Sequence, residues 1–530
     1  MINSENPVRA PGINLWQVFG NSAAAAPDRP ALIFQDDSIS FGELAAAARI
    51  CAGWLATKGL RKGDMVGLQV PKRPETYILW LACLHQGLPY VFMDPRNPVS
   101  RTHAIVARLE PKLLVTTSPA SSSKQDEMDR QAYAAETLEL PISQDWRVWL
   151  HDIDTGTAPD PAGCHGLDPA YAMFTSGSTG EPKGAVIPHQ GVLSLMRWVS
   201  AAVSRPGELR FSNLNPLHFD NAVFDLYGGL INGSTLVPVE TTAIANPALW
   251  TRRLRDGEAN VIFAVPTLFQ SLDRLNLLNP DRLPGAKVFV FGGEGYPVDD
   301  LIGFYDRFSE QARLINVYGP TETSCICSSL ELDREALDSA TMMFPSLGRM
   351  HPDFEYAIMD DQEPAKVGES GELWIGGANV GLGYYNNPEE SARRFRQDPR
   401  QANFRSIWYR TGDLVREDRD GLLWFGGRVD NQVKIRGHRI ELEEIDLAIE
   451  SIPGVTRAIA VAVTGSHGQE LRAAYVTERP VAEENVREIC KARLPVYMQP
   501  ALFRQLDALP LNANGKVDRQ AVKAMLGEGA

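Results

Sequence analysis

Hydrophobic and polar positions follow two alternating periods along the first part of the chain. Phe41–Leu55 is an alanine-rich stretch with helical spacing, and Thr76–Leu84 has the same spacing. Met65–Val70 and Leu113–Thr117 are short apolar runs that predict buried strands, and the second follows a helical stretch that runs through Arg108. Helices and strands in this alternation predict parallel sheets with helices on their faces.

Two further apolar runs end in loops that carry polar residues. Val288–Phe291 precedes Gly292–Glu294, and Arg313–Val317 precedes a loop that contains Thr321. Open α/β sheets bind ligands at the carboxyl ends of their strands. We therefore expect functional side chains in both loops, whereas the polar segments Ser118–Arg130 and Asp152–Gly166 predict solvated loops.

The pattern changes again near Asp430. Gly371–Gly427 predicts short, turn-rich strands with a hairpin at Asp418–Gly421, whereas the stretch after Asp430 has a strand–helix pattern of its own. We predict two domains. Residues 1–429 form a large domain of parallel sheets flanked by helices, with a small β-barrel-like part, and residues 430–530 form a small, mobile α+β lid.

The elements expected in this lid are a helix at Glu443–Ser451, a strand at Val455–Val463 and a second helix at Glu483–Arg493.

Composition and charge narrow the class of protein. A chain of 530 residues is too long for one hydrophobic core, and a net charge of −14 argues against a nucleic-acid partner. No apolar run approaches the roughly 18 residues of a membrane span, and Met1–Asn6 lacks a secretion signal. Six scattered cysteines, with only Cys325 and Cys327 close together, favour free thiols over a metal site. We expect a cytoplasmic protein.

Residues 175–184 read Thr-Ser-Gly-Ser-Thr-Gly-Glu-Pro-Lys-Gly, directly after the apolar segment Ala170–Phe174. Glycines leave backbone amides open, hydroxyls add donors and Lys183 adds a positive charge, so such a loop can wrap a phosphate group. The spacing differs from the P-loop and from the Gly-x-Gly-x-x-Gly turn. Taken alone, the segment could equally be a flexible linker.

Short segments that stand in one order along almost the whole chain remove the linker reading. They are Ser40–Leu44, Leu88–Pro95, Asn316–Glu322, Gly371–Ile375, Tyr409–Leu414, Gly427–Glu441, Leu494–Met498 and Asn514–Arg519. Together with the phosphate loop, this set resembles the motifs of the adenylate-forming enzymes: acyl-CoA synthetases, luciferases and the adenylation domains of non-ribosomal peptide synthetases. The chain is most similar to a stand-alone amino-acid adenylation enzyme of the last group.

The resemblance implies ATP and Mg²⁺ as cofactors and assigns a role to each motif. Tyr318 would stack on adenine, Asn316 would meet its polar edge, Thr321 would contact the α-phosphate, and Glu322 would help to ligate Mg²⁺. The β- and γ-phosphates would be held by Thr175, Ser176, Gly177, Ser178, Thr179, Gly180 and Lys183.

The remaining motifs concern the ribose and the lid. Asp413 would accept both ribose hydroxyls, and Arg428 would reach the ribose or a phosphate. Lys516 is the expected catalytic residue, because its ammonium would bridge the substrate carboxylate and the α-phosphate. Asp430 is the expected hinge. One lid orientation would present Lys516, and the other would bring the Gly437–Glu441 strand towards a phosphopantetheine thiol.

Asp220 is the reason for expecting an amino acid as substrate. His218–Asp225 resembles the pocket motif of amino-acid-activating members, in which the aspartate after phenylalanine pairs with the substrate ammonium. An aspartate without a partner in such a pocket would be costly. The alternative is a structural aspartate that caps the following helix, and the nearby Asp225 leaves the assignment less sharp.

By the same resemblance, the substrate side chain would be lined by Asn221, Phe224, Phe263, Val290, Gly292, Val317, Cys325 and Ile326. The bulky Phe224 and Phe263 indicate a small or medium side chain, such as that of alanine or serine. Asn221 could bind a polar side chain or an amino group in the β position, so a β-amino acid stays open.

The sequence also indicates a partner. The chain stops shortly after Lys516 without a carrier segment, so we expect a separate phosphopantetheinylated carrier protein, in non-ribosomal peptide synthesis of secondary metabolism. The main alternative is an acyl or aryl acid–CoA or acyl-ACP ligase, and a non-catalytic nucleotide-binding protein is a second. The chain departs from many relatives at Gly381–Gly383, which has Gly-Leu-Gly in place of Ala-Arg-Gly and is expected to affect only a surface loop.

Overall fold

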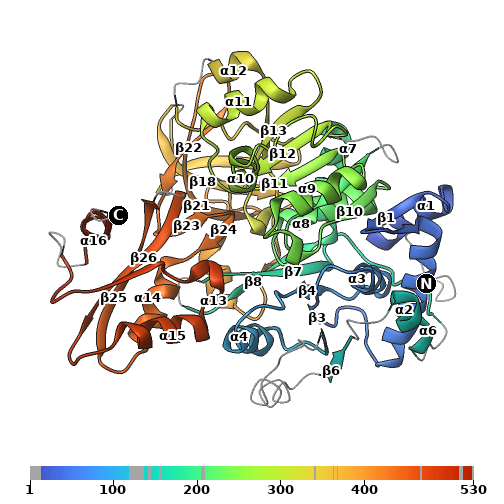
Figure 1. Ribbon diagram of the computed structural model, residues 1–530, viewed down its shortest axis with the longest axis horizontal. Coiled ribbons are helices and arrows are strands. Elements are labelled where there is room, and N and C mark those ends of the chain that lie inside the picture. The colour runs from blue at the N-terminus through green and yellow to red at the C-terminus, as the bar shows by residue number, and fades with distance from the viewer. Residues whose placement is uncertain are drawn as a thin grey trace.

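The structure, a computed structural model, describes residues 14–117, 136–140, 145–153, 158–177, 180–203, 209–338, 342–361, 363–366, 368–465, 468–511 and 517–527. Two large mixed sheets and an antiparallel sheet build the N-terminal part, and a small C-terminal domain lies beside them (Figure 1). The fold is therefore mixed α/β, as the sequence predicts. The expected loop at Ser118–Arg130 lies outside the described residues.

The larger sheet has nine strands and is parallel through its centre, with antiparallel pairs at both edges. Its order is β15 (Arg349–Met350), β14 (Ser328–Leu332), β13 (Arg313–Tyr318), β12 (Val288–Gly292), β11 (Val261–Ala264), β9 (Arg210–Asn213), β10 (Thr235–Pro238), β1 (Pro30–Phe34) and β2 (Asp37–Ser40).

The second sheet has seven strands, of which β4, β3, β5 and β6 continue parallel from β7. Its order is β19 (Gly383–Tyr384), β8 (Lys183–Pro188), β7 (Pro169–Thr175), β4 (Tyr90–Phe92), β3 (Val66–Gln69), β5 (Leu113–Thr116) and β6 (Glu136–Glu139).

The third sheet is antiparallel and forms the β-rich part that the sequence predicts. It consists of β17 (Glu363–Pro364), β16 (Phe354–Asp360), β18 (Ser370–Gly377), β21 (Ile407–Glu417), β20 (Phe395–Gln397) and β22 (Leu423–Arg428). The Asp418–Gly421 hairpin is confirmed between β21 and β22. The expectation of short strands is wrong for β21, which has 11 residues and pairs with three neighbours.

Helices cover both faces of the two mixed sheets. In the N-terminal part they are α1 (Leu15–Ala25), α2 (Phe41–Thr57), α3 (Pro74–Gln86), α4 (Val99–Leu109), α6 (Trp146–Asp152), α7 (His189–Ala202), α8 (Asn221–Val223), the π-helix η1 (Phe224–Ile231), the 3₁₀ turn η2 (Thr241–Ala243), α9 (Pro247–Asp256), α10 (Pro266–Arg274), α11 (Val298–Phe308), the 3₁₀ turn η3 (Thr321–Thr323), α12 (Arg334–Asp338) and α13 (Pro388–Arg394).

The Val-Phe-Val-Phe run of β12 shows how the layers arise. Val288 and Val290 point into the core that the two mixed sheets share, whereas Phe289 and Phe291 join the cluster under α10 and α11. Successive side chains of a strand point to opposite faces, so a strand covered by helices on both sides must be apolar at every position. β12 is therefore an inner strand of the nine-stranded sheet, between β13 and β11.

The Ser40–Leu44 motif has a local structural cause. The Ser40 hydroxyl accepts a hydrogen bond from the Glu43 amide at 3.2 Å, and the Glu43 carboxylate accepts one from the Ser40 amide at 2.8 Å. This reciprocal capping box satisfies two amides at the start of α2. The motif thus fixes where α2 begins.

The C-terminal domain has its own core. Its elements are the hairpin β23 (Val433–Ile435) and β24 (His438–Ile440), α14 (Leu442–Glu450), β25 (Val455–Gly465), β26 (Gly468–Thr477), α15 (Glu483–Arg493), the 3₁₀ turn η4 (Val496–Met498), β27 (Leu502–Gln505) and α16 (Arg519–Gly527). Two buried clusters of this domain contain only residues from Ile435 onward. The predicted helices at Glu443–Ser451 and Glu483–Arg493 are confirmed, the second at both ends.

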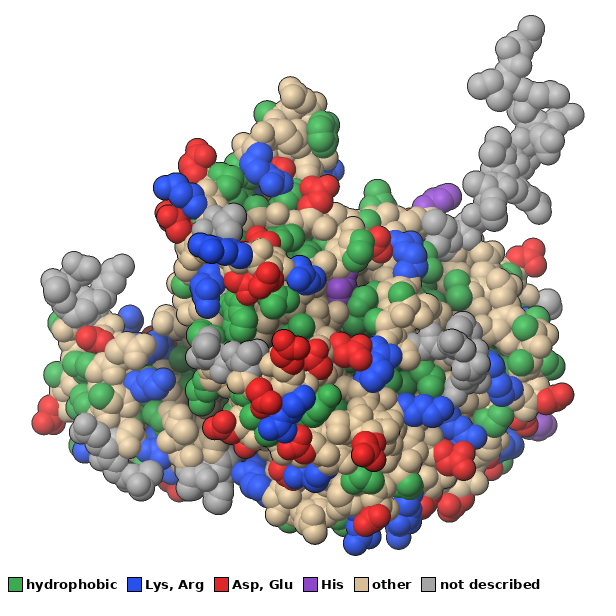
Figure 2. Space-filling view, turned by 90° about the horizontal axis from the view of Figure 1, so that it is seen from above, with side chains coloured by type: hydrophobic (Ala, Val, Ile, Leu, Met, Phe, Trp, Pro, Cys, Tyr) green, Lys and Arg blue, Asp and Glu red, His purple; other side chains and the backbone are tan. Residues whose placement is uncertain are grey.

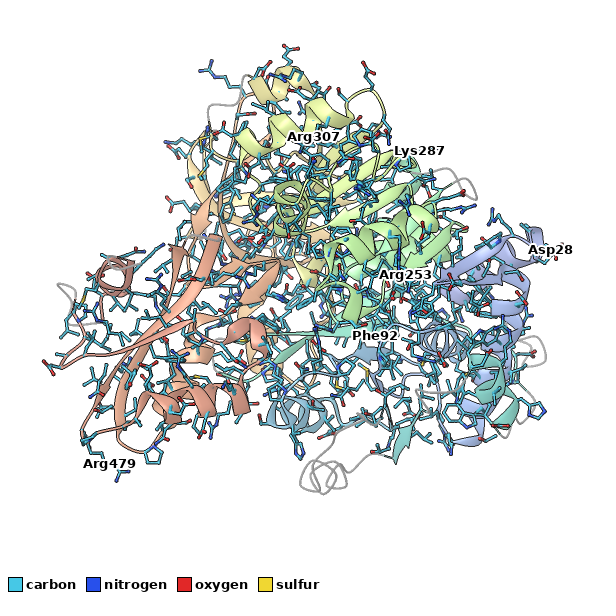
Figure 3. The ribbon with its side chains drawn as sticks, in the orientation of Figure 1. Asp28, Phe92, Arg253, Lys287, Arg307 and Arg479 are labelled. Atoms are coloured by element: carbon cyan, nitrogen blue, oxygen red, sulfur yellow. The ribbon has the colours of Figure 1, made fainter. Side chains whose placement is uncertain are left out.

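Charged and hydrophobic side chains are mixed on the surface of the molecule. Basic and acidic side chains are interspersed with hydrophobic ones on the face shown in Figure 2. Phe92, at the end of β4, lies near the middle of the molecule, whereas Arg479 lies at its outer edge, just after β26 (Figure 3). Among the described residues, no helix is both long and apolar enough to cross a membrane.

Candidate active site

A cavity of about 70 Å³ lies where the carboxyl ends of β7, β11 and β13 face the β23–β24 hairpin of the C-terminal domain. Its walls come from both domains: Met173, Phe174, Thr175, Ser176, His218, Phe219, Asp220, Asn221, Phe263, Gly293, Val317, Gly319, Pro320, Thr321, Cys325, Ile326, Thr411, Asp413, Arg428, Gln432, Lys434, Gly437, Arg439 and Tyr497. The structure thus brings together residues from most of the motifs identified in the sequence.

The loop at residues 175–184 connects two antiparallel strands. Thr175 is the last residue of β7, and Lys183 is the first residue of β8. A Cβ on Gly177 would lie 2.1 Å from the Glu181 carbonyl oxygen, and Gly180 has a φ of +80°. Both glycines are therefore needed for the turn. Ser178 and Thr179 lie outside the described residues.

Glu322 is a carboxylate beside the cavity that has both a hydrogen-bond donor and an ion-pair partner. It is fully buried, accepts a hydrogen bond from the Tyr384 hydroxyl at 2.7 Å and pairs with Arg439 at 2.9 Å. Burial alone would raise the pKa of its carboxyl, but Arg439 and Lys183 outweigh burial and hold the pKa at about 2. Glu322 is thus a permanent anion, as a ligand of a hard cation requires.

Several buried donors around this carboxylate have no acceptor. Among the described residues, they include the Thr175 hydroxyl, the Lys183 ammonium, and Nε and Nη2 of Arg439. The nearest carboxylate oxygens to Lys183 Nζ belong to Glu441 at 3.6 Å and Glu390 at 3.7 Å. Buried donors without acceptors are rare in folded proteins. This cluster therefore fits a bound anion such as a phosphate group.

A second chain of interactions runs from Tyr318 to Asp430. The Tyr318 hydroxyl donates to Asp413 at 2.5 Å, and Arg428 contacts both Asp413 and Asp430. The Asn316 amide donates to the Ser346 carbonyl at 2.8 Å. Burial would raise the pKa of the Asp430 carboxyl, yet Arg428 and Arg394 hold the pKa at about 2. The predicted ribose site and the predicted hinge therefore share one arginine.

Asp220 is a wall residue of the cavity whose carboxylate has few polar partners. Its carboxylate accepts a hydrogen bond from the Thr321 hydroxyl at 2.5 Å and makes no ion pair with any described residue. Burial raises its pKa, and Lys434 and Arg439 oppose this only through space. The capping alternative is wrong, because Asp220 precedes α8 but its side chain makes no hydrogen bond to the helix. Its carboxylate therefore lacks a cation in the pocket.

Asp225 has a different role. It is fully buried on η1, where it accepts hydrogen bonds from Asn213 at 2.9 Å and Asn215 at 3.3 Å, and it does not line the cavity. Burial raises its pKa, and the nearby Lys72 opposes this rise. The ambiguity between the two aspartates is thereby removed.

The expected side-chain pocket is partly open to the cavity. Asn221, Phe263, Val317, Cys325 and Ile326 line it. Phe224, Val290 and Gly292 lie behind this lining, and the ring of Phe224 meets that of Phe263 edge-on with centroids 5.1 Å apart. Phe263 therefore forms part of the cavity wall, and Phe224 packs against it from behind.

The β23–β24 hairpin is docked on the phosphate loop. The Ser176 hydroxyl donates to the Arg439 carbonyl at 2.9 Å and accepts from the Glu441 amide at 3.2 Å. Lys434 of the same hairpin lies with its ammonium 5.7 Å from the Tyr318 ring centroid. In this arrangement the C-terminal domain brings two cations to the site, Lys434 and Arg439, of which Arg439 pairs with Glu322.

The predicted catalytic lysine, Lys516, lies outside the described residues. Val517 packs on a cluster with Val461 and Val522 that contains no residue of the N-terminal part. Figure 1 shows α16 at the outer edge of the C-terminal domain, beyond β26. The described part of the chain nearest to Lys516 thus lies away from the cavity.

Sequence reasoning gave no site role to Tyr384, Lys434 or Arg439. Tyr384 follows the Gly381–Gly383 segment, and the expectation that this segment is only a surface loop is wrong. Gly381 and Gly383 are buried, and the Gly381 amide donates to the Glu322 carbonyl at 2.8 Å. The available signal for Lys434 and Arg439 was their place in the predicted hinge motif.

Within the described residues, no group of three or more histidine, cysteine or acidic side chains could hold a metal ion alone. A cation at Glu322 would therefore need ligands from a bound molecule, such as phosphate oxygens.

Comparison with known proteins shows the family to which the chain belongs. The family model for AMP-binding enzymes matches residues 19–385, and that for the C-terminal domain of AMP-binding enzymes matches residues 444–516. Tyrocidine synthase 1 from Brevibacillus parabrevis is 30% identical over 514 residues, which are 97% of this chain and 45% of that protein. The chain therefore spans less than half the length of this relative.

Solved structures have the same fold. An artificially fused adenylation–PCP di-domain from Klebsiella oxytoca, NpsA-ThdA, gives a TM-score of 0.80 at 23% identity and covers 94% of this chain and 95% of its own. The o-succinylbenzoate CoA synthetase from Bacillus subtilis gives a TM-score of 0.82 at 23% identity, with 96% and 98% covered.

Proposed function

The chain belongs to the AMP-binding enzyme family and is an adenylate-forming enzyme, and we propose that it activates an amino acid for transfer to a carrier protein. In the first half-reaction, a carboxylate oxygen of the amino acid attacks the α-phosphorus of ATP, and pyrophosphate leaves. In the second, a phosphopantetheine thiol loses its proton and attacks the carbonyl carbon, and AMP leaves. The aminoacyl group ends as a thioester.

Asp220 is the observation that carries the choice of an amino acid. Its partly buried carboxylate makes no ion pair with a described residue, and the cavity beside it is also lined by apolar side chains such as Phe263 and Val317. A substrate ammonium would pair with Asp220 and remove the cost of this buried charge. The aromatic pair of Phe224 and Phe263 supports a small or medium substrate side chain.

Asn221 supports a polar contact in the same pocket. Its amide lines the cavity next to Gly293, at a position that a β-amino group or a small polar side chain could reach. A small L-α-amino acid and a β-amino acid are thus both covered by the proposal.

The phosphate loop and its neighbours support the ATP site. The Thr175 hydroxyl and the Lys183 ammonium have no acceptors among the described residues, and phosphate oxygens would satisfy them once the hairpin has left. We assign the β- and γ-phosphates to the loop from Thr175 to Lys183, including Ser178 and Thr179. Thr321 would contact the α-phosphate.

For the nucleoside, we assign Tyr318 to the adenine face, Asn316 to its edge, and Asp413 and Arg428 to the ribose. Glu322 would hold Mg²⁺, which would neutralise charge on the phosphate oxygens. Arg439 is paired with Glu322 in the structure, so it must withdraw before that carboxylate can serve another cation.

Two orientations of the C-terminal domain separate the half-reactions in this proposal. The docked β23–β24 hairpin supports the thiol-transfer orientation, since Ser176 and Glu322 are engaged by Arg439 and its neighbours. Adenylation would need a rotation about Asp430, the proposed domain boundary, that brings Lys516 to the substrate carboxylate.

The proposed partner is a phosphopantetheinylated carrier protein, and the proposed setting is non-ribosomal peptide synthesis in the cytoplasm. The adenylation–PCP arrangement of NpsA-ThdA supports the kind of partner.

The experiment that tests the proposal is amino-acid-dependent exchange of labelled pyrophosphate into ATP. A panel should contain the proteinogenic amino acids, β-alanine and 3-aminobutyrate, together with fatty acids and benzoic acids. We expect exchange with one or a few amino acids, and only with Mg²⁺ present. Exchange driven equally well by fatty or benzoic acids would instead favour an acid–CoA or acyl-ACP ligase.

A further inference from the structure

The turn of the β23–β24 hairpin makes a close contact with the N-terminal domain. Arg436 and Gly437 form this two-residue turn, and both have positive φ, +51° and +76°. A turn with two such residues matches the twist of an antiparallel hairpin. A Cβ on Gly437 would lie 2.4 Å from Cγ1 of Val265, so the turn rests directly on the residue before α10.

One carboxylate ties this turn to the N-terminal domain. Oε2 of Glu294 accepts a hydrogen bond from the Gly437 amide at 3.0 Å. Oε1 accepts one from the Thr267 amide at 2.8 Å and another from the Thr267 hydroxyl. Glu294 follows β12 by two residues, and Thr267 lies in the first turn of α10. The carboxylate is therefore held by one domain and binds the backbone of the other.

This contact differs from the other contacts of the hairpin. Ser176 and Glu322, which engage Arg439 and Glu441, belong to the proposed phosphate and Mg²⁺ sites, so the substrate competes for them. Glu294 does not line the cavity. Its bond to Gly437 can therefore form and break with the position of the C-terminal domain alone.

We infer that Glu294 is a positioning residue that holds the C-terminal domain in the orientation seen here. Charge-assisted hydrogen bonds to a backbone amide are about twice as strong as neutral ones. Losing this bond should depopulate the docked orientation and leave the N-terminal site intact. The assignment of this orientation to thiol transfer rests on the proposed function, whereas the docking itself does not.

Hydrogen–deuterium exchange of the free protein tests the docking without any substrate. Glu294→Ala removes both acceptor oxygens, and Glu294→Gln replaces one of them by a donor. We expect the peptide that covers residues 433–440 to exchange on the order of ten-fold faster in both variants, because the Gly437 amide loses its charged acceptor. Peptides of β25 and β26 should not change.

Glu331→Gln is the matched control. Glu331 is a half-exposed carboxylate on β14 that pairs with Arg313, and it lies in the N-terminal part without a contact to the hairpin. It should leave the protection of residues 433–440 unchanged. Unchanged protection in Glu294→Ala as well would overturn the inference.

Kinetics of the two half-reactions then test the role in transfer. Glu294→Ala and Glu294→Gln should keep pyrophosphate exchange within about two-fold and slow single-turnover transfer to a carrier thiol on the order of ten-fold. Thr267→Val, which removes only the hydroxyl that orients Glu294, should give a smaller effect in the same direction and guards against misfolding of the stronger variants. Equal slowing of both half-reactions would reduce Glu294 to a structural residue and overturn the inference.

The two proposals fail separately. If no amino acid supports pyrophosphate exchange in the wild-type chain, the proposed function is wrong. The protection of residues 433–440 against hydrogen–deuterium exchange still decides whether Glu294 docks the hairpin.

Discussion

The proposed class of substrate depends on one partly buried carboxylate, that of Asp220. Its only described hydrogen-bond donor is the Thr321 hydroxyl, and it has no ion pair in the part of the chain that the structure describes. Glu322, by contrast, is fully buried and fully compensated by Arg439 and Tyr384. The difference between the two carboxylates indicates that one awaits an external cation and the other is held ready by the protein.

Replacing Asp220 should therefore damage amino-acid use more than ATP use. Asp220→Ala leaves the substrate ammonium buried without a partner, which typically costs about 3–5 kcal/mol, so kcat/KM for the amino acid should fall at least ~100-fold. Steady-state kinetics with each substrate varied in turn will measure this, and the KM for ATP should change little.

Asp220→Asn is the control, because it keeps an acceptor for Thr321 and removes only the charge. It should be impaired almost as strongly as Asp220→Ala. Wild-type activity in either variant would mean that Asp220 is a structural residue, and the acid–CoA ligase would become the better account.

At the scale of elements, we propose that the position of the β23–β24 hairpin decides which half-reaction the site can perform. While the hairpin is docked, Arg439 occupies Glu322 and the Glu441 carboxylate lies 3.6 Å from the Lys183 ammonium. These contacts place opposite charges beside Glu322 and Lys183. In the proposed ATP complex, Mg²⁺ and the phosphate groups would take these places. Docking and triphosphate binding are therefore alternatives in this account, and the hairpin has to leave and return in each catalytic cycle.

Gly437→Ala should prevent the β23–β24 hairpin from docking again on the N-terminal domain. A methyl group at this position would clash with Val265, and the positive φ adds backbone strain. We expect transfer to a carrier thiol to fall at least ten-fold, while pyrophosphate exchange stays within about three-fold. Rapid-quench measurement of the two half-reactions will separate them.

Gly468→Ala is the matched control in the same domain. Gly468 also has a positive φ, +103°, but nothing lies within 4 Å of its Cβ position. If both variants lose transfer equally, backbone strain rather than docking explains the loss.

The elements themselves could largely be predicted from local pattern. The apolar run of β12 and the helical spacing of α15 depend on neighbouring residues only, and both were predicted within one residue of their observed ends. The length of β21 was not, because its 11 residues are fixed by pairing with β18, β20 and β22 from other parts of the chain.

The site was predictable where a motif carries its own chemistry and not where distant residues meet. Glu322 could be recognised within its motif, but its partners could not. Tyr384 lies 62 residues away in sequence and Arg439 lies 117 residues away. Only the folded chain shows that a hairpin of the C-terminal domain neutralises the proposed metal ligand.

For the whole molecule, we propose that the two domains perform the two half-reactions in two different orientations. The structure has the β23–β24 hairpin at the cavity, while Val517 packs at the far side of the C-terminal domain. In this arrangement the Gly437–Glu441 segment lies at the cavity, and Val517, the described residue next to Lys516 in the chain, does not. The catalytic cycle we propose therefore requires a rotation about Asp430 between adenylation and transfer.

Lys516→Ala should impair adenylation, whereas Gly437→Ala should impair transfer to the carrier thiol. Removing the ammonium that would bridge the carboxylate and the α-phosphate should lower the rate of adenylate formation by roughly 10²–10³-fold, with ATP binding near normal. Calorimetric titration with ATP and single-turnover adenylate formation will measure the two quantities. A loss of ATP affinity without a comparable loss of rate would make Lys516 a binding residue.

The most direct test of the whole account is the intact mass of a phosphopantetheinylated carrier protein after incubation with the chain, ATP, Mg²⁺ and the amino acid that supports exchange. We predict that the carrier gains the mass of one aminoacyl group, that Asp220→Ala and Gly437→Ala abolish most of this gain, and that free CoA is a poor acceptor. Rapid thioester formation on CoA, with no mass gain on any carrier, would contradict the assignment even if the ATP chemistry were confirmed.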